Sequence, residues 1–96
     1  MKPSAALEAN RAAIRFAAHR FKAINPRVFG SVVHGSDLDG SDLDLLVDPL
    51  PGTTLFDLGG LQAELEELLG VPVDLLTPGD LAPKLRRRIL DTTKPV

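Results

Sequence analysis

Cysteine, tryptophan and tyrosine are all absent from this 96-residue chain, and basic residues do not outnumber acidic ones. Without cysteine there are no disulfide bonds and no thiolate metal sites. Four phenylalanines offer few platforms for stacking bases, and a net charge of −2 gives no overall basic field. Direct nucleic-acid binding is therefore not expected.

Long hydrophobic runs are also missing. No stretch is long enough to span a bilayer, and the N-terminus lacks the apolar segment of a signal peptide. A balance of 44% hydrophobic and 25% charged residues is ordinary for a globular protein. We therefore expect one soluble domain over residues 1–96, with no membrane contact and a cytoplasmic location. A domain of this size would need a partner to hold any large substrate.

What the chain does contain is a stretch of small and acidic residues, from Phe29 to Val47, that joins a Gly-Ser turn to a strand. From Asp42 onward, Asp42, Asp44 and Leu46 alternate with an apolar set that would face a core: Leu43, Leu45 and Val47. Carboxylates two positions apart on a strand are separated by about 6.6 Å along it. They can lean toward one ion, and hard oxygen ligands of this kind suit Mg²⁺.

Gly30 and Ser31 supply the complement to these carboxylates. Glycine lets a phosphate approach the backbone closely, and serine adds a hydroxyl donor beside backbone N–H groups. A helical turn that began just after Ser31 would also favour an anion at its N-terminus. The two features together predict a nucleotide and metal site.

The whole pattern from Gly30 to Asp44, Gly-Ser-x₃-Gly-x₅-Ser-Asp-x-Asp, resembles the active-site signature of the nucleotidyltransferases of the DNA polymerase β superfamily. In size the chain is similar to the minimal nucleotidyltransferases of bacteria and archaea, which contain little more than that catalytic core. The resemblance implies one or two Mg²⁺ ions and ATP as the substrate. It also implies nucleotide-binding roles for Gly30, Ser31, His34 and Ser41, and catalytic and metal-binding roles for Asp42, Asp44 and Asp74.

His34 departs from the more usual family motif, Gly-Ser-x-Ala-Arg-Gly, which has an arginine at this position. A histidine can donate to phosphate but lacks the permanent charge of arginine. How strongly the site holds a nucleotide is therefore open.

A calcium loop beginning at Asp37 is rejected, because Asp42 and Asp48 stand where glycine and the closing glutamate are required. Residues 37–40 are predicted to form a polar, mobile turn.

Two helices are expected on either side of this stretch. Ser4 can cap the first, which would end at Asn25-Pro26 before a strand over residues 27–29. Thr53 or Thr54 can cap the second, which Gly70 would end. Its Gly59-Gly60 pair indicates either close packing or a helix that starts only at Leu61. The apolar stripe of this second helix is predicted to consist of Leu58, Leu61, Leu65 and Leu68.

A third strand is predicted over residues 71–77, where Asp74-Leu75-Leu76 repeats the pattern that begins at Asp44. The strand-helix-strand segment has the length of a βαβ crossover, so the two strands would be parallel. If they are neighbours, Asp74 lies near Asp44. A last helix is predicted, with Leu81, Leu85 and Ile89 along one of its faces. Its basic residues, Lys84 and 86–88, form either a solvated face or a docking surface.

These elements predict an α/β (α+β) fold with the core of the polymerase β-like nucleotidyltransferases. Its order is α-β-β-α-β-α, with a small mixed sheet covered by helices. Aspartates that only kept a sheet edge soluble would explain neither Gly30-Ser31 nor Asp74. A polymerase or tRNA-modifying activity is disfavoured, because the chain has no second domain and no basic net charge.

The resemblance implies Mg²⁺-dependent transfer of AMP from ATP to a partner protein. Minimal nucleotidyltransferases often occur as antitoxins of small helical HEPN-type toxins, so such a toxin is the expected partner. The alternative is a non-catalytic antitoxin that neutralises a HEPN-type toxin by complex formation. The sequence leaves the choice open.

Overall fold

Four strands form one mixed sheet in the order β3-β2-β1-β4 in the computed structural model, which describes residues 1–96. The strands are β1 (Ala23–Phe29), β2 (Leu43–Pro49), β3 (Val73–Leu76) and β4 (Lys94–Pro95). The helices are α1 (Pro3–Ala9), α2 (Arg11–Arg20), α3 (Ser31–His34), α4 (Leu55–Leu69) and α5 (Pro83–Thr92), with a 3-10 turn, η1, over Pro78–Asp80. The predicted α/β class and mixed sheet are confirmed.

The sheet is mixed because β2 has two kinds of neighbour. It pairs antiparallel with β1 and parallel with β3, and α4 connects the two parallel strands. In the parallel pair Asp44 lies opposite Asp74. The prediction that these strands are parallel neighbours is confirmed. β4, which was not predicted, pairs with Arg27 and Val28 at the other edge of the sheet.

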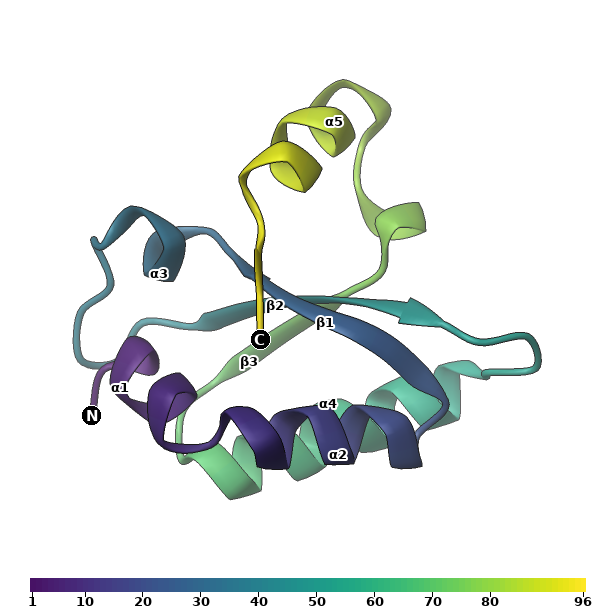
Figure 1. The fold of residues 1–96 in the computed structure, drawn as a ribbon, viewed down its shortest axis with the longest axis horizontal. Helices are drawn as coiled ribbons and strands as arrows, with labels where there is room; N and C mark the ends of the chain where they lie inside the picture. The colour runs from purple at the N-terminus through teal and green to yellow at the C-terminus, as the bar shows by residue number, and fades with distance from the viewer.

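Helices α2 and α4 cover one face of the sheet, whereas α3 and α5 lie on its other side (Figure 1). The core lies between the sheet and the α2–α4 layer. Its largest side chains with almost no exposure include Ile14 of α2, Leu45 and Val47 of β2, and Leu61 and Leu65 of α4. The alternation predicted from Asp42 onward therefore holds, because its apolar set faces the helices. None of the helices is sufficiently long and apolar to cross a membrane.

The N-terminal segment differs from the predicted single helix. It is divided at Asn10, whose side-chain amide donates to the carbonyl of Ala6 at 2.9 Å. The second part ends at Arg20, and β1 already begins at Ala23, before Asn25-Pro26. Asn25 adopts a left-handed φ of 53° where the β1–β2 register shifts, so the strand bends around this dipeptide. The predicted helix end at Asn25-Pro26 is therefore wrong.

Helix α4 starts earlier than Leu61 and includes both glycines. Thr54 and Asp57 form a reciprocal capping box at its first turn. Gly70 ends the helix, as predicted, and does so in a left-handed conformation. Gly60 is required by packing, because a β-carbon there would lie 2.8 Å from the ring of Phe21. The buried stripe is Leu61, Leu65 and Leu69, whereas Leu68 is 41% exposed, contrary to the prediction.

Helix α5 buries none of its own residues. Leu81 is buried but precedes the helix, so its predicted place on the helix is wrong, and Leu85 on the predicted apolar face is 49% exposed. Arg86 joins the helix to the η1 turn by donating to the carbonyls of Pro78 and Leu81 at 3.0 and 3.2 Å. The helix lies on the side of the sheet opposite α2 and α4, after η1 (Figure 1).

Candidate active site

Asp44 and Asp74 are brought together by the parallel register of β2 and β3. They are direct partners across the two strands, 30 positions apart in the sequence. Asp44 is partly buried and Asp74 is exposed. Side chains of directly paired residues project from the same face of a sheet, so these two carboxylates share one surface. Asp42 lies just before the first residue of β2 and is exposed.

The surroundings of Asp44 disfavour its charge. Leu46, on the same side of β2, is completely buried, so the sheet face becomes apolar two residues beyond the carboxylate. Burial raises the pKa of Asp44 to about 6, and the negative charges of Asp74 and Asp42 contribute to the increase. A cation at this place would relieve the repulsion among the three carboxylates.

The donor set fits a hard divalent cation, because it consists of carboxylate oxygens that repel one another until a positive charge is added. The three side chains do not, however, form a ready cage. No group of three or more carboxylates or imidazoles converges closely enough to hold a metal ion by itself. A bound cation would therefore need ligands from outside the protein, such as phosphate oxygens and water.

Gly30 lies directly against Asp44 at the end of β1. Its neighbour Phe29 pairs with Asp44 across the antiparallel strands, and a β-carbon on Gly30 would overlap the Asp44 carboxylate. Its φ of 75° and ψ of −144° lie in a region that essentially only glycine adopts. The backbone at Gly30 can therefore approach a group bound at Asp44 more closely than any side chain would allow.

The helical turn expected just after Ser31 is present as α3. It runs from Ser31 to His34, and Gly35 ends it with a φ of 71°. The backbone hydrogen bonds of the turn begin with the N–H of Val33, which donates to the carbonyl of Gly30 at 3.1 Å. The N–H groups before that point have no partner within the turn, which is the condition for binding an anion.

The other two predicted nucleotide-binding residues, His34 and Ser41, make no hydrogen bond to the three aspartates. His34 is exposed at the end of α3 and makes no side-chain hydrogen bond. The hydroxyl of Ser41 accepts a hydrogen bond from the N–H of Leu38 at 2.9 Å, and so closes a turn just before Asp42. Ser41 therefore has a local structural contact that the sequence pattern did not predict.

One residue near the site was assigned the wrong environment. Asp37 was predicted to belong to a mobile turn, but it is only 6% exposed and accepts a hydrogen bond from the N–H of Ser4 at 2.9 Å. This hydrogen bond lowers the pKa of the carboxyl group. Ser4 is not the cap that was expected, because its side chain makes no capping bond and α1 follows Lys2. Helix α1 begins at Pro3 and has no side-chain cap of its own. This unfilled start of the helix was the one sign in the sequence that a distant carboxylate could accept its N–H groups.

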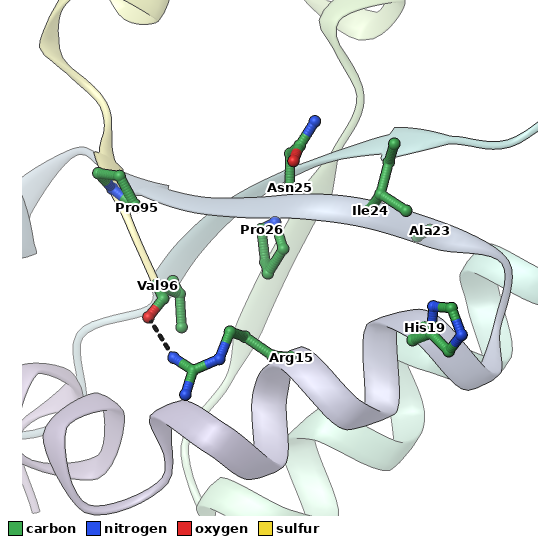
Figure 2. A pocket seen from close by; sticks show the side chains of 8 residues that line it. All are labelled: Arg15, His19, Ala23, Ile24, Asn25, Pro26, Pro95 and Val96. Atoms are coloured by element: carbon green, nitrogen blue, oxygen red, sulfur yellow. Dashed lines mark hydrogen bonds between the residues drawn. The ribbon is translucent and has the colours of Figure 1, made fainter.

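The aspartates lie on an open face, and none of the surface hollows is lined by Asp42, Asp44 or Asp74. A cavity of about 340 Å³ opens elsewhere, between α2 and β1, with Arg15 and His19 on its helical side. Figure 2 shows the Arg15 guanidinium directed at the Val96 carbonyl, to which it donates at 2.7 Å. This cavity is separate from the carboxylate face.

Comparison with known proteins identifies the family. The family model described as "Nucleotidyltransferase domain" matches residues 11–96, which include Gly30, Asp44 and Asp74. The chain belongs to this family. A solved structure described as "Structure of putative minimal nucleotidyltransferase" is 43% identical, covers 100% of this chain and 97% of its own, and superposes with a TM-score of 0.88. This nucleotidyltransferase is thus similar to a minimal member over its whole described length.

A curated relative matches a shorter segment of this nucleotidyltransferase. "Putative protein adenylyltransferase MJ0435" of Methanocaldococcus jannaschii is 48% identical over 48 residues, which are 50% of this chain and 52% of the relative. The match thus spans about half the length of that protein. The adenylyltransferase activity in its name is that of the relative.

Two further solved structures share the fold at lower identity. One, described as a toxin-antitoxin with AMP-PNP, is 22% identical with a TM-score of 0.75 and covers 90% of this chain and 71% of its own. The other, a mutant of the toxin-antitoxin MntA-HpeT, is 20% identical with a TM-score of 0.70 and covers 91% and 70%. At these identities the likeness shows a shared fold alone.

Proposed function

We propose that this nucleotidyltransferase transfers AMP from ATP to a partner protein and neutralises a HEPN-type toxin in this way. The observation that carries the proposal is the paired position of Asp44 and Asp74 beside Gly30. Two carboxylates and a close backbone approach are what a Mg²⁺-bound triphosphate requires. The name of the curated relative and the AMP-PNP complex of the distant neighbour support adenylyl transfer.

Asp42, Asp44 and Asp74 would hold one or two Mg²⁺ ions, which supply charge neutralisation at the transferred phosphoryl group. Gly30 and Ser31 would bind the β- and γ-phosphates through backbone N–H groups and the serine hydroxyl. His34 would contact the nucleotide from the end of α3, where it is exposed. Ser41 would contact it from the position just before Asp42.

The reaction would be an in-line displacement at the α-phosphorus. An acceptor hydroxyl, such as that of a tyrosine, forms the new oxygen–phosphorus bond while the bond to the bridging oxygen of the β-phosphate breaks, and pyrophosphate leaves. Asp74 is exposed and adjacent to Asp44, so it can take up the proton of the attacking hydroxyl. Positioning and charge neutralisation carry most of such a reaction, so few residues are needed.

The test combines the purified protein with Mg²⁺, ATP labelled at the α-phosphate and a HEPN-type protein as candidate acceptor. Asp44→Asn should remove covalent label from the acceptor. Asp48→Asn is the matched control, because Asp48 lies on the same strand but pairs with Arg27 at 3.1 Å. We expect the control to retain labelling.

Three results would change the proposal. Label that persisted in Asp44→Asn would remove the carboxylates from catalysis. Neutralisation of the toxin without label, and unaffected by Asp44→Asn, would instead establish the non-catalytic antitoxin that acts by complex formation. Label on RNA would redirect the acceptor from protein to nucleic acid.

A further inference from the structure

Asp37 is the one charged side chain among the buried residues of the protein. Its carboxylate accepts a hydrogen bond from the N–H of Ser4, in the first turn of α1, at 2.9 Å. The contact joins two segments 33 positions apart in the sequence. Burial of an ionised carboxylate is unfavourable unless hydrogen bonds compensate for it, so this contact defines where Asp37 must lie.

The segment that contains Asp37 links the two halves of the candidate active site. On one side, the N–H of Ser36 donates to the carbonyl of Ser31 in α3 at 2.9 Å. On the other side, Leu38 and Ser41 close a turn through two hydrogen bonds of 2.9 and 3.0 Å, and Asp42 follows directly. One closed turn therefore separates the buried Asp37 from the first carboxylate of the site.

Asp42 lies just outside the paired residues of β2 and β3. It precedes β2, is exposed, and makes no side-chain hydrogen bond. Asp44 and Asp74, by contrast, are fixed by strand pairing. What determines the position of Asp42 is therefore the hydrogen bond at Leu43, whose N–H donates to Pro72 at 2.8 Å, and the anchored segment before it.

We propose that Asp37 is a positioning residue, which holds the 36–42 segment on α1 and so keeps Asp42 beside Asp44 and Asp74. The proposal rests on the proposed function, because the position of Asp42 matters for activity only if the carboxylates bind the cation of Mg²⁺–ATP. Asp37 itself would touch neither metal nor nucleotide. It acts through Asp42, as residues behind a metal ligand do elsewhere.

The experiment compares Asp37→Ala with Asp57→Ala. Both variants lose a carboxylate that accepts an N–H at the start of a helix at 2.9 Å, but Asp57 caps α4 through Thr54. A similar fall in melting temperature is expected for both. Isothermal titration with Mg²⁺ and AMP-PNP, at a temperature where both are folded, should show about tenfold weaker binding for Asp37→Ala. Binding by Asp57→Ala should stay within about twofold of the wild type.

Ser4→Pro approaches the same hydrogen bond from its other end. Proline is accepted in the first turn of a helix but has no N–H to donate. Ser4→Pro should weaken binding about as much as Asp37→Ala, and the double variant should be no weaker than either single one. Equal binding by Asp37→Ala, Asp57→Ala and the wild type would overturn the proposal, and so would additive losses in the double variant.

Amide hydrogen exchange at Ser41 gives a measurement that needs no nucleotide. Its N–H donates to Leu38 within the anchored segment, and its exchange should accelerate in Asp37→Ala but not in Asp57→Ala. If the wild type bound no Mg²⁺–AMP-PNP, the proposed function would fail and the positioning role with it. Accelerated exchange would then show an anchor that serves only the fold, and unchanged exchange would show no anchor.

Discussion

The α-carbon of Gly30 faces the carboxylate of Asp44 so closely that no β-carbon fits between them. Gly30→Ala should therefore displace Asp44 and also strain a backbone region that alanine rarely adopts. We expect a loss of about 2–4 kcal/mol in the free energy of unfolding and loss of nucleotide binding. Chemical denaturation and isothermal titration measure the two effects.

Gly35→Ala is the control for Gly30→Ala. Gly35 also has a positive φ, of 71°, but a β-carbon there would meet nothing within 4 Å. It should cost about 1 kcal/mol from backbone strain and leave the position of Asp44 unchanged. Equal effects of the two substitutions on nucleotide binding would contradict the assigned contact.

The raised pKa of Asp44 makes stability depend on pH in a defined direction. Its pKa is about 6 in the folded protein against an ordinary 3.8, so between these values the folded state binds more protons than the unfolded state. This group therefore destabilises the fold as the pH rises from about 4 to 6. In metal-free buffer at pH 7, Asp44→Asn should be more stable than the wild type by about 1–2 kcal/mol, after allowance for solvent screening.

The same comparison at pH 4 should show little difference between Asp44→Asn and the wild type, because the carboxyl group is then largely protonated in the folded protein. At pH 7, Asp48→Asn should instead be less stable than the wild type. Asp48 pairs with Arg27 at 3.1 Å and accepts from Asn25 at 3.1 Å, so its neutralisation should cost up to about 1 kcal/mol. If the stability gain of Asp44→Asn were the same at pH 4 and pH 7, the charge of Asp44 would not be its cause.

The two adjacent glycines of α4 should respond oppositely to the same substitution. A β-carbon at Gly60 would lie 2.8 Å from the Phe21 ring, whereas one at Gly59 would meet nothing within 4 Å. Gly59→Ala should stabilise the protein by about 0.5–1 kcal/mol, because alanine favours the helix. Gly60→Ala should destabilise it by about 1–3 kcal/mol through overpacking. Thermal unfolding of both variants measures the two effects. Equal shifts in melting temperature would argue against the Phe21 contact.

Leucines of α4 and α5 should differ in their contribution to stability. Leu61 is completely buried, and Leu61→Ala should cost about 2–5 kcal/mol. Leu85 is 49% exposed on a helix that buries none of its residues, so Leu85→Ala should change stability by no more than about 0.5 kcal/mol. Urea unfolding measures both. A large loss for Leu85→Ala would mean that α5 packs onto the sheet in solution.

The sequence by itself determined the local chemistry. The alternation after Asp42 placed the leucines in the core, and the repeat at Asp74 predicted a third carboxylate on a neighbouring strand. Gly70 predicted the end of α4, and the Gly-Ser pair predicted the turn that became α3. These features depend on intervals of a few residues, where backbone geometry alone decides which side chains share a face.

Only the tertiary structure decided which groups meet across long separations. It showed that Asp37 is buried against Ser4, that Gly60 gives room to Phe21, and that Leu85 faces solvent although its spacing suits a core. It also raised the pKa of Asp44, because burial and two neighbouring charges act together only in the folded sheet. Periodicity states which residues share a face, but the packing of other elements determines whether that face is covered.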